Sequence, residues 1–451
     1  MNLSAVVKRR GLAISPRNFH RIQRCYSSDA SFQQSTLTLF ENISENSGKL
    51  AQITLPDGQA CNLRLLRYPW NKTEPTTACL VWGHTKDALD LLAFEPQPIP
   101  APTRPGSYSI GPSTIPGAGL GMFAARDLVL GEAIAVERPI TVLAAGLPPE
   151  VPADADLQKW PWKALKEMQG RARGAFMEYL TEAQRTAFSA LYGRDDSQRF
   201  TRNYVEIGRL PGRYGGEHFA VFRDISRVNH SCSPNVELVW TRDTFCASLH
   251  ARKPIPRGTE LFRSYGPNTF QYWTRNERQS TLKSSYSFEC TCSSCSLTGD
   301  ASAESDARRT ILYQDFVGGQ ERIGALPGPQ GALTASDDAV RTGMETLLGF
   351  HSWVDDHSVP ATQFLAPSEE FARIVEEEDC WIGAHSLVHY TRLMLGHATL
   401  GNEDQARYWA RHAAEQVPGK YFGSQLEDYT YVEEDRPQDF PWWNARGHEK
   451  V

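Results

Sequence analysis

Apolar and polar residues alternate over short stretches in two parts of the chain, a pattern typical of strands that bury one face. The part before residue 96 contains two such stretches, at 51–55 and 61–66, and an apolar patch at 78–82. Further along, strands are predicted at 204–207, 219–222, 236–240, 245–249 and 260–264. Many short strands with few helices between them predict a compact β domain.

Within about 150–200 the apolar spacing becomes helical, with Phe188, Leu191 and Tyr192 at helical spacing. Residues 181–184 read Thr-Glu-Ala-Gln and match a capping box, in which the first and last side chains each bond the other residue's backbone. The pattern therefore predicts a helical insertion between β segments.

Helical spacing returns in the last third of the chain, at 340–348 and 387–398. Residues 395–414, two helical stretches around a Leu-Gly-Asn turn, resemble one tetratricopeptide (TPR-like) unit. A single unit of this kind cannot bury its own face. We expect it to pack on the β domain and to form one wall of a cleft, although a plain helical hairpin without a binding role fits the pattern equally well.

Proline, glycine and polar residues mark the boundaries. Five prolines between 96 and 105 predict a stiff linker, because proline fixes φ and removes a donor. The polar stretch 296–305 is expected to be flexible, and the acidic run 376–379 to be a solvated face. The predicted organisation is a tail at 1–28, a small β-rich lead-in at 29–95, a proline-rich linker at 96–106, the β domain at 107–285, a cysteine loop at 286–296 and a helical region at 297–451.

Composition narrows the class of protein. The chain has 451 residues, 40% of them hydrophobic, which allows a large core. It contains no run of about 18 or more apolar residues, so no membrane insertion is expected. A net charge of -6 argues against charge-driven binding, and no direct nucleic-acid binding is expected. We expect the protein to be a monomer.

The first 28 residues carry six lysines and arginines, and no acidic residue precedes Asp29. This composition is typical of a mitochondrial transit peptide, and residues 24–28 resemble a matrix-protease cleavage pattern. The alternatives are a basic disordered tail or a nuclear signal at 8–10, which would leave the protein nuclear or cytoplasmic.

The nine cysteines are unevenly spread, and three of them, Cys290, Cys292 and Cys295, lie in one short segment. Zinc prefers four thiolate or imidazole ligands, so these three thiols predict a zinc site whose fourth ligand comes from elsewhere. A labile disulfide or free thiols are the alternatives. For the scattered cysteines, Cys25, Cys61, Cys79, Cys246 and Cys380, simple packing is expected.

Three other segments are unusual for a protein core: a glycine-rich turn at 116–125, the polar stretch 228–235 and the strand 260–266, which ends in Tyr-Gly. Together with 290–295 they resemble, in this order, the four motifs of the SET-domain family, which comprises S-adenosylmethionine-dependent protein lysine methyltransferases. The resemblance covers about 107–296.

The insertion and residues 286–292 are similar to the branch that includes the SET-and-MYND proteins. This chain departs from that branch because no cysteine lies between 80 and 231, where a MYND zinc finger would need several. The implied fold is α+β: a β-rich SET domain of short strands with knotted-type C-terminal threading, a helical insertion, a zinc-binding post-SET loop and a C-terminal helical, TPR-like region.

The resemblance also implies roles for individual residues. Tyr265 would hold the amine and the methyl group in line, Tyr286 would line the lysine channel, and Cys232 would be the fourth zinc ligand. Residues expected to contact the cofactor S-adenosylmethionine are Gly119, Leu120, Gly121, Asn203, Asn229, His230, Tyr265 and Phe288. For Asn203 the match is loose, and a turn residue at a strand end is an equal alternative.

Two functions follow from these expectations. The first is direct methyl transfer from S-adenosylmethionine to a substrate lysine, and the second is a catalytically inactive, zinc-stabilised SET scaffold that recruits partners. One short segment bears Asn229, His230 and Cys232, so we also predict that loss of Cys232 weakens cofactor binding as well as zinc binding. The substrate protein and the number of methyl groups transferred are not specified by the motifs.

Overall fold

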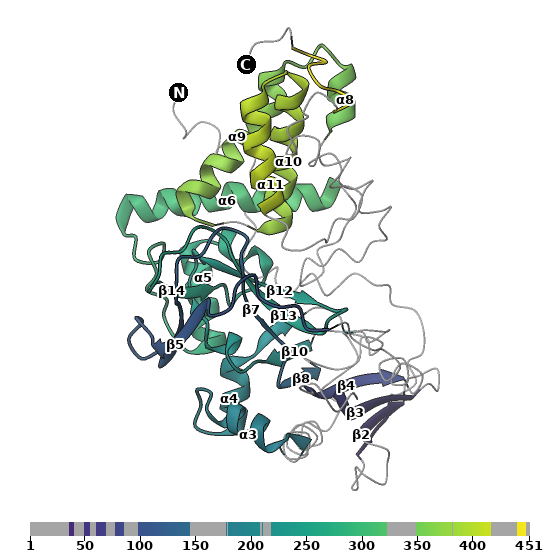
Figure 1. Cartoon of the computed structure of the whole chain (residues 1–451), viewed down its shortest axis with the longest axis vertical. Helices are drawn as coiled ribbons and strands as arrows, with labels where there is room; N and C mark the ends of the chain where they lie inside the picture. Colours follow the sequence, from purple (N-terminus) through teal and green to yellow (C-terminus); the bar gives the residue numbers. More distant parts are fainter. Residues whose placement is uncertain are drawn as a thin grey trace.

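The computed structural model describes residues 36–39, 49–54, 60–68, 77–84, 98–144, 177, 179–207, 210, 218–322, 349–380, 382–415 and 440–447. Its strands form the lower part of the molecule in Figure 1, and most of its C-terminal helices stand on one side of them. The transit-peptide prediction for 1–28 lies outside the described residues. No helix of the described part is long and apolar enough to cross a membrane.

The largest sheet joins segments from before and after the proline-rich stretch. In spatial order it contains β1 (Thr36–Leu39), β2 (Lys49–Thr54), β3 (Ala60–Tyr68), β4 (Thr77–His84), β8 (Thr141–Ala144), β10 (His218–Val221) and β9 (Val205–Ile207). Neighbours are antiparallel except β4 and β8, which run parallel. The predicted boundary at 96–106 therefore separates segments that share one sheet.

Two smaller sheets complete the β region. One has the order β11 (Asn229–His230), β14 (Glu260–Arg263), β6 (Leu120–Ala124) and β5 (Tyr108–Pro112), and the other has the order β12 (Val236–Thr241), β13 (Cys246–Ala251) and β7 (Ala133–Glu137). Strand β11 runs parallel to β14, with Asn229 opposite Phe262. This pairing places the polar stretch 228–235 beside the segment 260–266.

All three sheets contribute to one apolar core. In β9 the side chains of Val205 and Ile207 are buried while Glu206 between them is exposed, as the alternation predicts. Met122 of β6, Leu249 of β13 and other strand residues pack into the same cluster. The predicted strands in 204–264 are confirmed.

The helical insertion is described from residue 179 and contains α3 (Glu182–Ser189) and α4 (Asp196–Asn203). The predicted capping box is present: the Gln184 backbone N–H donates to Thr181 Oγ1 at 3.2 Å, and the Thr181 N–H donates to Gln184 Oε1 at 2.9 Å. Phe188 and Leu191 are buried, but Tyr192 is exposed. The helix ends at Ser189, so the predicted helical spacing holds for Phe188 but does not extend to Leu191 and Tyr192.

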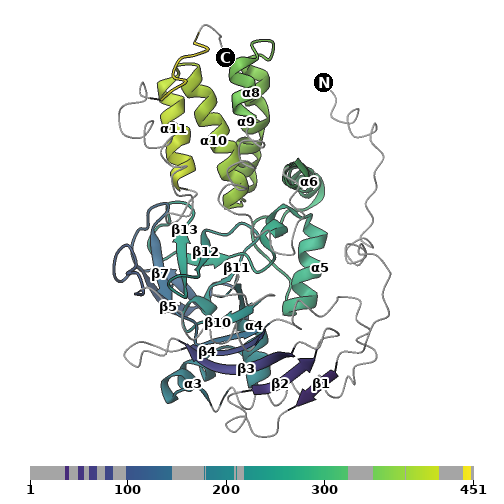
Figure 2. The same ribbon diagram turned by 90° about the vertical axis from the view of Figure 1, so that its right-hand side faces the viewer.

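The C-terminal third is helical, with α5 (Arg275–Tyr286), α6 (Gly299–Arg322), α8 (Phe350–Asp355), α9 (Ala361–Glu378), α10 (Gly383–Thr399) and α11 (Glu403–Glu415). Figure 2 shows α9, α10 and α11 side by side above the sheets. The predicted helices within 387–414 are confirmed as α10 and α11, whereas 340–348 lies outside the described residues. The likeness to a tetratricopeptide unit stays a prediction.

Two expectations about polar segments are wrong. The stretch 296–305 was expected to be flexible, but α6 begins within it, at Gly299. The acidic run 376–379 is not uniformly solvated, because Glu378 is buried and its carboxylate accepts from Ser305 Oγ at 2.6 Å, Arg308 Nε at 2.6 Å and Arg309 Nε at 2.9 Å. Cationic partners from α6 remove the cost of burying this charge.

Candidate functional site

The glycine turn and the polar stretch meet through Asn229. Its side-chain amide donates to the Leu120 carbonyl at 3.2 Å and to Glu260 Oε1 at 2.9 Å. Gly119 has φ +79°, which side-chain-bearing residues rarely adopt. A Cβ added at Gly121 would lie 2.2 Å from Glu260 Oε1. Strand β6 therefore lies so close to this carboxylate that only glycine fits at position 121.

The Glu260 carboxylate bonds several groups around Asn229, a role that the sequence did not predict. This carboxylate accepts from Ser113 Oγ at 2.8 Å and from the Thr114 backbone N–H at 2.7 Å, in addition to Asn229. The residue is buried at the first position of β14. An acidic residue that opens a buried strand is the signal that could have identified it, because a buried carboxylate needs several donors.

His230 is buried next to Asn229, and both of its ring nitrogens are engaged. Nδ1 accepts from the Tyr265 backbone N–H at 3.0 Å, and Nε2 lies 3.4 Å from Cys232 Sγ. Burial lowers the pKa of His230 to about 3, so the ring is neutral at pH 7. The side chain thus connects Tyr265 to the cysteine cluster, and a role for His230 at the cofactor stays a prediction.

Tyr265 follows β14 and is held at both ends. Its hydroxyl donates to the Val228 carbonyl at 3.1 Å, and its backbone N–H donates to His230. The Arg263 guanidinium lies 4.4 Å from the Tyr265 ring centroid. Burial raises the pKa of Tyr265 above its ordinary value. The hydroxyl is therefore a neutral donor at physiological pH, in a position fixed by two separate segments.

Tyr286 and Phe288 reach the same place from the end of α5. The helix ends at Tyr286 because Ser287 adopts a left-handed conformation, φ 62°, and the chain then reverses. The Tyr286 hydroxyl donates to the Tyr265 carbonyl at 3.0 Å, and the two rings lie 5.1 Å apart. Phe288 stands edge-on to Tyr265 at 6.3 Å.

A further aromatic residue belongs to this group. The Tyr204 ring lies 6.3 Å from that of Tyr286 and 4.2 Å from that of Phe219. From the sequence, Tyr204 was predicted only as a strand residue, and nothing in its local pattern distinguishes it. Burial, followed by the neighbouring Tyr204, raises the pKa of Tyr286 well above its ordinary value. Three tyrosines and Phe288 thus form an aromatic group of four rings, contributed by three separate segments.

Asn203 is placed differently from the other predicted cofactor residues. Its side-chain amide donates to the Tyr192 carbonyl at 2.7 Å and to the Arg199 carbonyl at 2.6 Å. Both amide hydrogens are therefore used to secure the end of α4. This arrangement favours the turn alternative, and a role for Asn203 at the cofactor stays a prediction.

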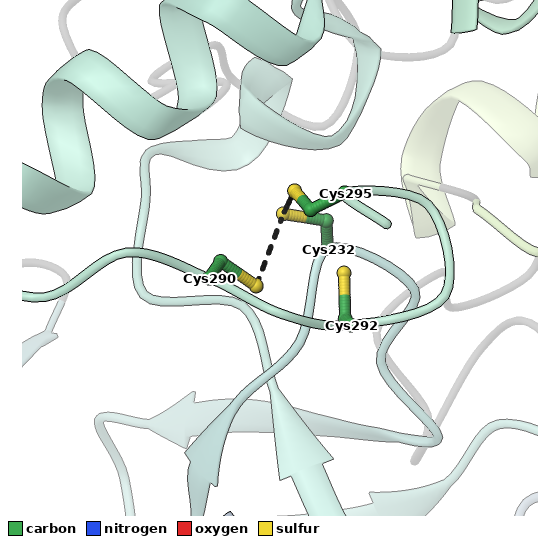
Figure 3. Close-up of side chains that lie close together, drawn as sticks. All are labelled: Cys232, Cys290, Cys292 and Cys295. Carbon is green, nitrogen blue, oxygen red and sulfur yellow. Dashed lines mark hydrogen bonds between the residues drawn. The ribbon is translucent and has the colours of Figure 1, made fainter. Parts of the chain in front are cut away.

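Cys232, Cys290, Cys292 and Cys295 form a compact cluster (Figure 3), with all four sulfur atoms within 4.8 Å of one another. Cys232 Sγ lies 4.0 Å from Cys290 Sγ and 3.5 Å from Cys295 Sγ, well beyond disulfide bonding distance. Contacts with the other three thiols, followed by burial, raise the pKa of Cys232. Several thiolates can coexist here only beside a cation.

The cysteine segment is tied to α5 by hydrogen bonds to its backbone. The Gln279 side chain bonds Cys290 twice, donating to its carbonyl at 2.7 Å and accepting from its N–H at 2.9 Å. Arg275 Nε donates to the Cys295 carbonyl at 2.7 Å. The fully buried Arg278 lies 4.0 Å from Cys295 Sγ and places a positive charge beside the thiols.

A tetrathiolate zinc site has sulfur atoms about 3.8 Å apart, because the Zn–S distance is about 2.3 Å in a tetrahedron. The observed separations from Cys232 Sγ, 3.5 and 4.0 Å, agree with this geometry. The donor set and its spacing therefore fit zinc. Cys79, Cys246 and Cys380 lie apart as buried core residues, while Cys25 lies outside the described residues.

Residues 119–266 match the model of the SET domain. The match begins at the glycine turn and ends with Tyr265 and Gly266, so it encloses the corner formed by Asn229 and Glu260. The chain therefore carries a SET domain, within an α+β fold that continues into a helical C-terminal region. The cysteine segment 290–295 follows the matched part.

Parts of this chain are similar to curated protein methyltransferases. The histone-lysine N-methyltransferase set5 of Schizosaccharomyces pombe is 33% identical over 125 residues, 27% of this chain and 37% of that protein. The N-lysine methyltransferase SMYD2-B of Xenopus laevis is 37% identical over 123 residues, 27% of this chain and 26% of the relative. The human protein-lysine N-methyltransferase SMYD4 is 37% identical over 75 residues, which are 17% of this chain and 9% of that protein. The part of this chain that matches thus covers between 9% and 37% of the length of these relatives.

Proposed function

We propose that this protein is an S-adenosylmethionine-dependent protein-lysine N-methyltransferase. The observation that carries the proposal is the position of Tyr265 at the end of the matched SET segment. Its hydroxyl and its backbone N–H are bonded to two residues of the polar stretch, Val228 and His230, and its ring faces Tyr286 and Phe288. A single tyrosine therefore lies where the polar stretch, the end of β14 and the end of α5 meet.

Methyl transfer requires a neutral lysine amine, whereas free lysine titrates near pH ~10.4, so deprotonation at neutral pH costs about 4–5 kcal/mol. The tyrosine rings of the aromatic group exclude water from the amine and lower its pKa by desolvation. The buried Arg263 guanidinium, 4.4 Å from the Tyr265 ring, disfavours a second positive charge nearby. Both effects act in the direction that the reaction needs.

S-adenosylmethionine supplies the electrophilic methyl group, which leaves sulfur as the nitrogen–carbon bond forms. Tyr265 and Tyr286 align the amine for this displacement, and the amine proton has already passed to solvent. The backbone of Gly119, Leu120 and Gly121 and the Phe288 ring form the proposed cofactor pocket, and Asn229 supports it by bonding the Leu120 carbonyl. Beside it, the buried Oγ of Ser264 and Nε of Arg263 have no partner, which suits a site built for a polar ligand.

We further propose that Cys232, Cys290, Cys292 and Cys295 bind one structural zinc ion. The separations of their sulfur atoms and the nearby Arg278 support it. Because Phe288 lies two residues before Cys290, the ion would hold the aromatic side of the pocket in place. The proposed substrate is a protein segment that contains lysine.

The test is transfer of a labelled methyl group from S-adenosylmethionine to proteins of a cell extract. We expect labelling by the wild type and a loss of at least about 100-fold for Tyr265→Phe, because removal of the hydroxyl frees the ring to move. Tyr313→Phe is the matched control, since Tyr313 is exposed on α6, away from the aromatic group, and this variant should keep full activity.

Equal labelling by the wild type and Tyr265→Phe would contradict the assigned role of Tyr265. A folded, zinc-loaded wild type that binds no S-adenosylmethionine and labels nothing would instead support the inactive scaffold. Labelled proteins identified by mass spectrometry would also reveal the substrate.

For the cellular location we propose mitochondria, on the composition of residues 1–28 alone. Fluorescence microscopy of a C-terminal fusion should show overlap with a mitochondrial dye, and deletion of 1–28 should abolish it. A fusion confined to the nucleus or cytoplasm would exclude import.

A further inference from the structure

A second group of metal-binding side chains lies in the helical region, away from the cysteines. It consists of Asp315 on α6 and of His385 and His389, one turn apart on α10. Asp315 Oδ2 lies 2.8 Å from the Nε2 atom of each histidine, and the two Nε2 atoms are 3.3 Å apart. Three potential ligand atoms from two helices thus converge on one point.

The distances suit a single ion. Nitrogen and oxygen ligands lie about 2.0–2.2 Å from zinc, so two neighbouring ligands are about 2.9 Å apart at 90° and about 3.4 Å apart at a tetrahedral angle. The observed 2.8 and 3.3 Å lie close to this range. Two histidines and one carboxylate on one side of an ion are a common donor set for divalent transition metals.

The side chains around the histidines hold the rings in the required orientation. His385 Nδ1 lies 3.2 Å from the Tyr272 hydroxyl, and His389 Nδ1 lies 3.0 Å from Ser368 Oγ. Each hydroxyl can accept from an Nδ1–H. In that tautomer the Nε2 lone pair of each ring faces Asp315 and is available to an ion, as metal-binding histidines require. The Phe371 ring stacks on His389 at 3.9 Å and fixes its plane.

One side of the group is open to solvent. The histidine side chains are 8% and 9% exposed, whereas the Asp315 side chain is 36% exposed. An ion could therefore enter past the carboxylate, and water could complete its coordination. The two histidine rings are already ordered by packing in the folded protein, so an ion that binds there loses little free energy to ordering them.

We propose that Asp315, His385 and His389 bind a divalent transition-metal ion of the zinc type, with water in the remaining coordination positions. The ion would clamp α6 to α10. It would also brace the 3-10 helix η5 (Asn268–Tyr272), because Tyr272 contacts His385. This site is independent of the cysteine cluster and of the proposed methyl transfer.

The metal content of the purified full-length protein tests the proposal. After equilibration with zinc and removal of loosely bound metal, we expect about two zinc ions per chain in the wild type and about one in His385→Gln/His389→Gln. Asp315→Asn provides a milder second variant and should weaken the second ion by at least about 10-fold, as loss of a charged ligand does. His397→Gln is the matched control, because His397 is buried on the same helix but lies outside the group, and it should retain both ions.

Cobalt substitution distinguishes the two sites spectroscopically. Cobalt at the cysteine cluster should show strong sulfur-to-metal charge-transfer bands that Cys290→Ser/Cys292→Ser abolishes. Cobalt at the Asp–His–His group should give only weak bands, which persist in that variant and vanish in His385→Gln/His389→Gln. If the wild type binds about one ion, removed by the cysteine substitutions and unaffected by the histidine and aspartate substitutions, the proposal is overturned.

Discussion

The cysteine cluster and the Asp315–His385–His389 group differ in the kind of structure that holds their ligands. Three of the cysteines lie in a short segment without helix or strand after α5, and the fourth follows β11. In the second group the histidines are held by α10, by hydrogen bonds and by a stacked phenylalanine. Side-chain hydrogen bonds to the backbone of an irregular segment hold the first set of ligands, whereas the packing of helices holds the second. We therefore expect the first set to depend more strongly on its proposed ion.

Removal of the metal should therefore have unequal consequences. A structural zinc ion contributes roughly 10–16 kcal/mol in small peptides that fold only around it. A site preformed by packing gains only the stabilisation that mass action supplies, about 2.7 kcal/mol at a metal concentration 100 times Kd. The following predictions test this difference.

The largest effect is expected for Cys232→Ser. It should remove the zinc ion of the cysteine cluster, lower Tm by more than any other substitution considered, and weaken S-adenosylmethionine binding, because Cys232 lies three residues from Asn229 and contacts His230. Metal analysis, thermal unfolding and calorimetry check the three effects. A variant that lost zinc but bound the cofactor normally would show that the two halves of this segment are independent.

The next largest effect is expected from the loss of the Arg309 hydrogen bonds, which join the helical region to the cysteine segment. Arg309, fully buried on α6, bonds Glu378 and donates to Ser294 Oγ at 2.9 Å, beside Cys295. Arg309→Met should reduce the free energy of unfolding by about 3–5 kcal/mol, because Glu378 loses one buried partner.

Urea unfolding measures this loss, with Arg373→Met as the control. Arg373 pairs with exposed Glu370 and Glu377 on the surface of α9, so its loss should cost at most about 1 kcal/mol. Equal effects of the two substitutions would mean that the buried tie does not join the two regions.

Zinc at the Asp–His–His group should give a smaller stabilisation. With the cysteine cluster filled, added zinc at 100 times Kd should stabilise the wild type by about 2.7 kcal/mol and leave His385→Gln/His389→Gln unchanged. Thermal unfolding with and without free zinc measures it. A loss of the helical fold in the metal-free wild type would show that packing alone does not assemble this group.

The stability of the protein should also depend on pH through Glu137, an effect that involves no metal. It must be separated from zinc binding, which depends on pH as well. Burial raises the pKa of Glu137 from 4.5 to about 7, even though the Ile225 N–H donates to its carboxylate at 2.9 Å. Below pH 4.5 the carboxyl is protonated in both the folded and the unfolded protein and has no effect. As the pH rises to 7 the unfolded state loses its proton first, so stability falls.

Glu137→Gln should therefore match the wild type near pH 4.5 and exceed its stability at pH 8 by roughly 2 kcal/mol, less than the pKa shift alone implies because the side chain is partly exposed. Unfolding curves across this range provide the comparison. A constant difference at all pH values would show that Glu137 is not the titrating group.

Local patterns in the sequence predicted the local structure well. The strands in 204–264 and the capping box at Thr181 needed only alternation and spacing, and both are present. The clustering of Cys290, Cys292 and Cys295 predicted a thiol site because three ligands lie in one segment. The inclusion of Cys232 came only from the family resemblance, and the structure does bring it to the other three.

Features that depend on distant partners were missed. Glu378 resembled a surface acid because Arg308 and Arg309, which neutralise it, lie about 70 residues earlier in the chain. Helix α9 contains Pro367, which usually argues against a helix interior. His385 and His389 show the one-turn spacing of a metal-binding pair, but nothing local connects them to Asp315.

Isothermal titration calorimetry of the zinc-loaded full-length protein measures whether this SET domain binds S-adenosylmethionine. We expect a saturable heat of binding with about one cofactor per chain, greatly weakened by Asn229→Ala, because Asn229 holds the glycine turn through the Leu120 carbonyl. A folded wild-type protein that takes up zinc but gives no heat with S-adenosylmethionine would contradict this expectation.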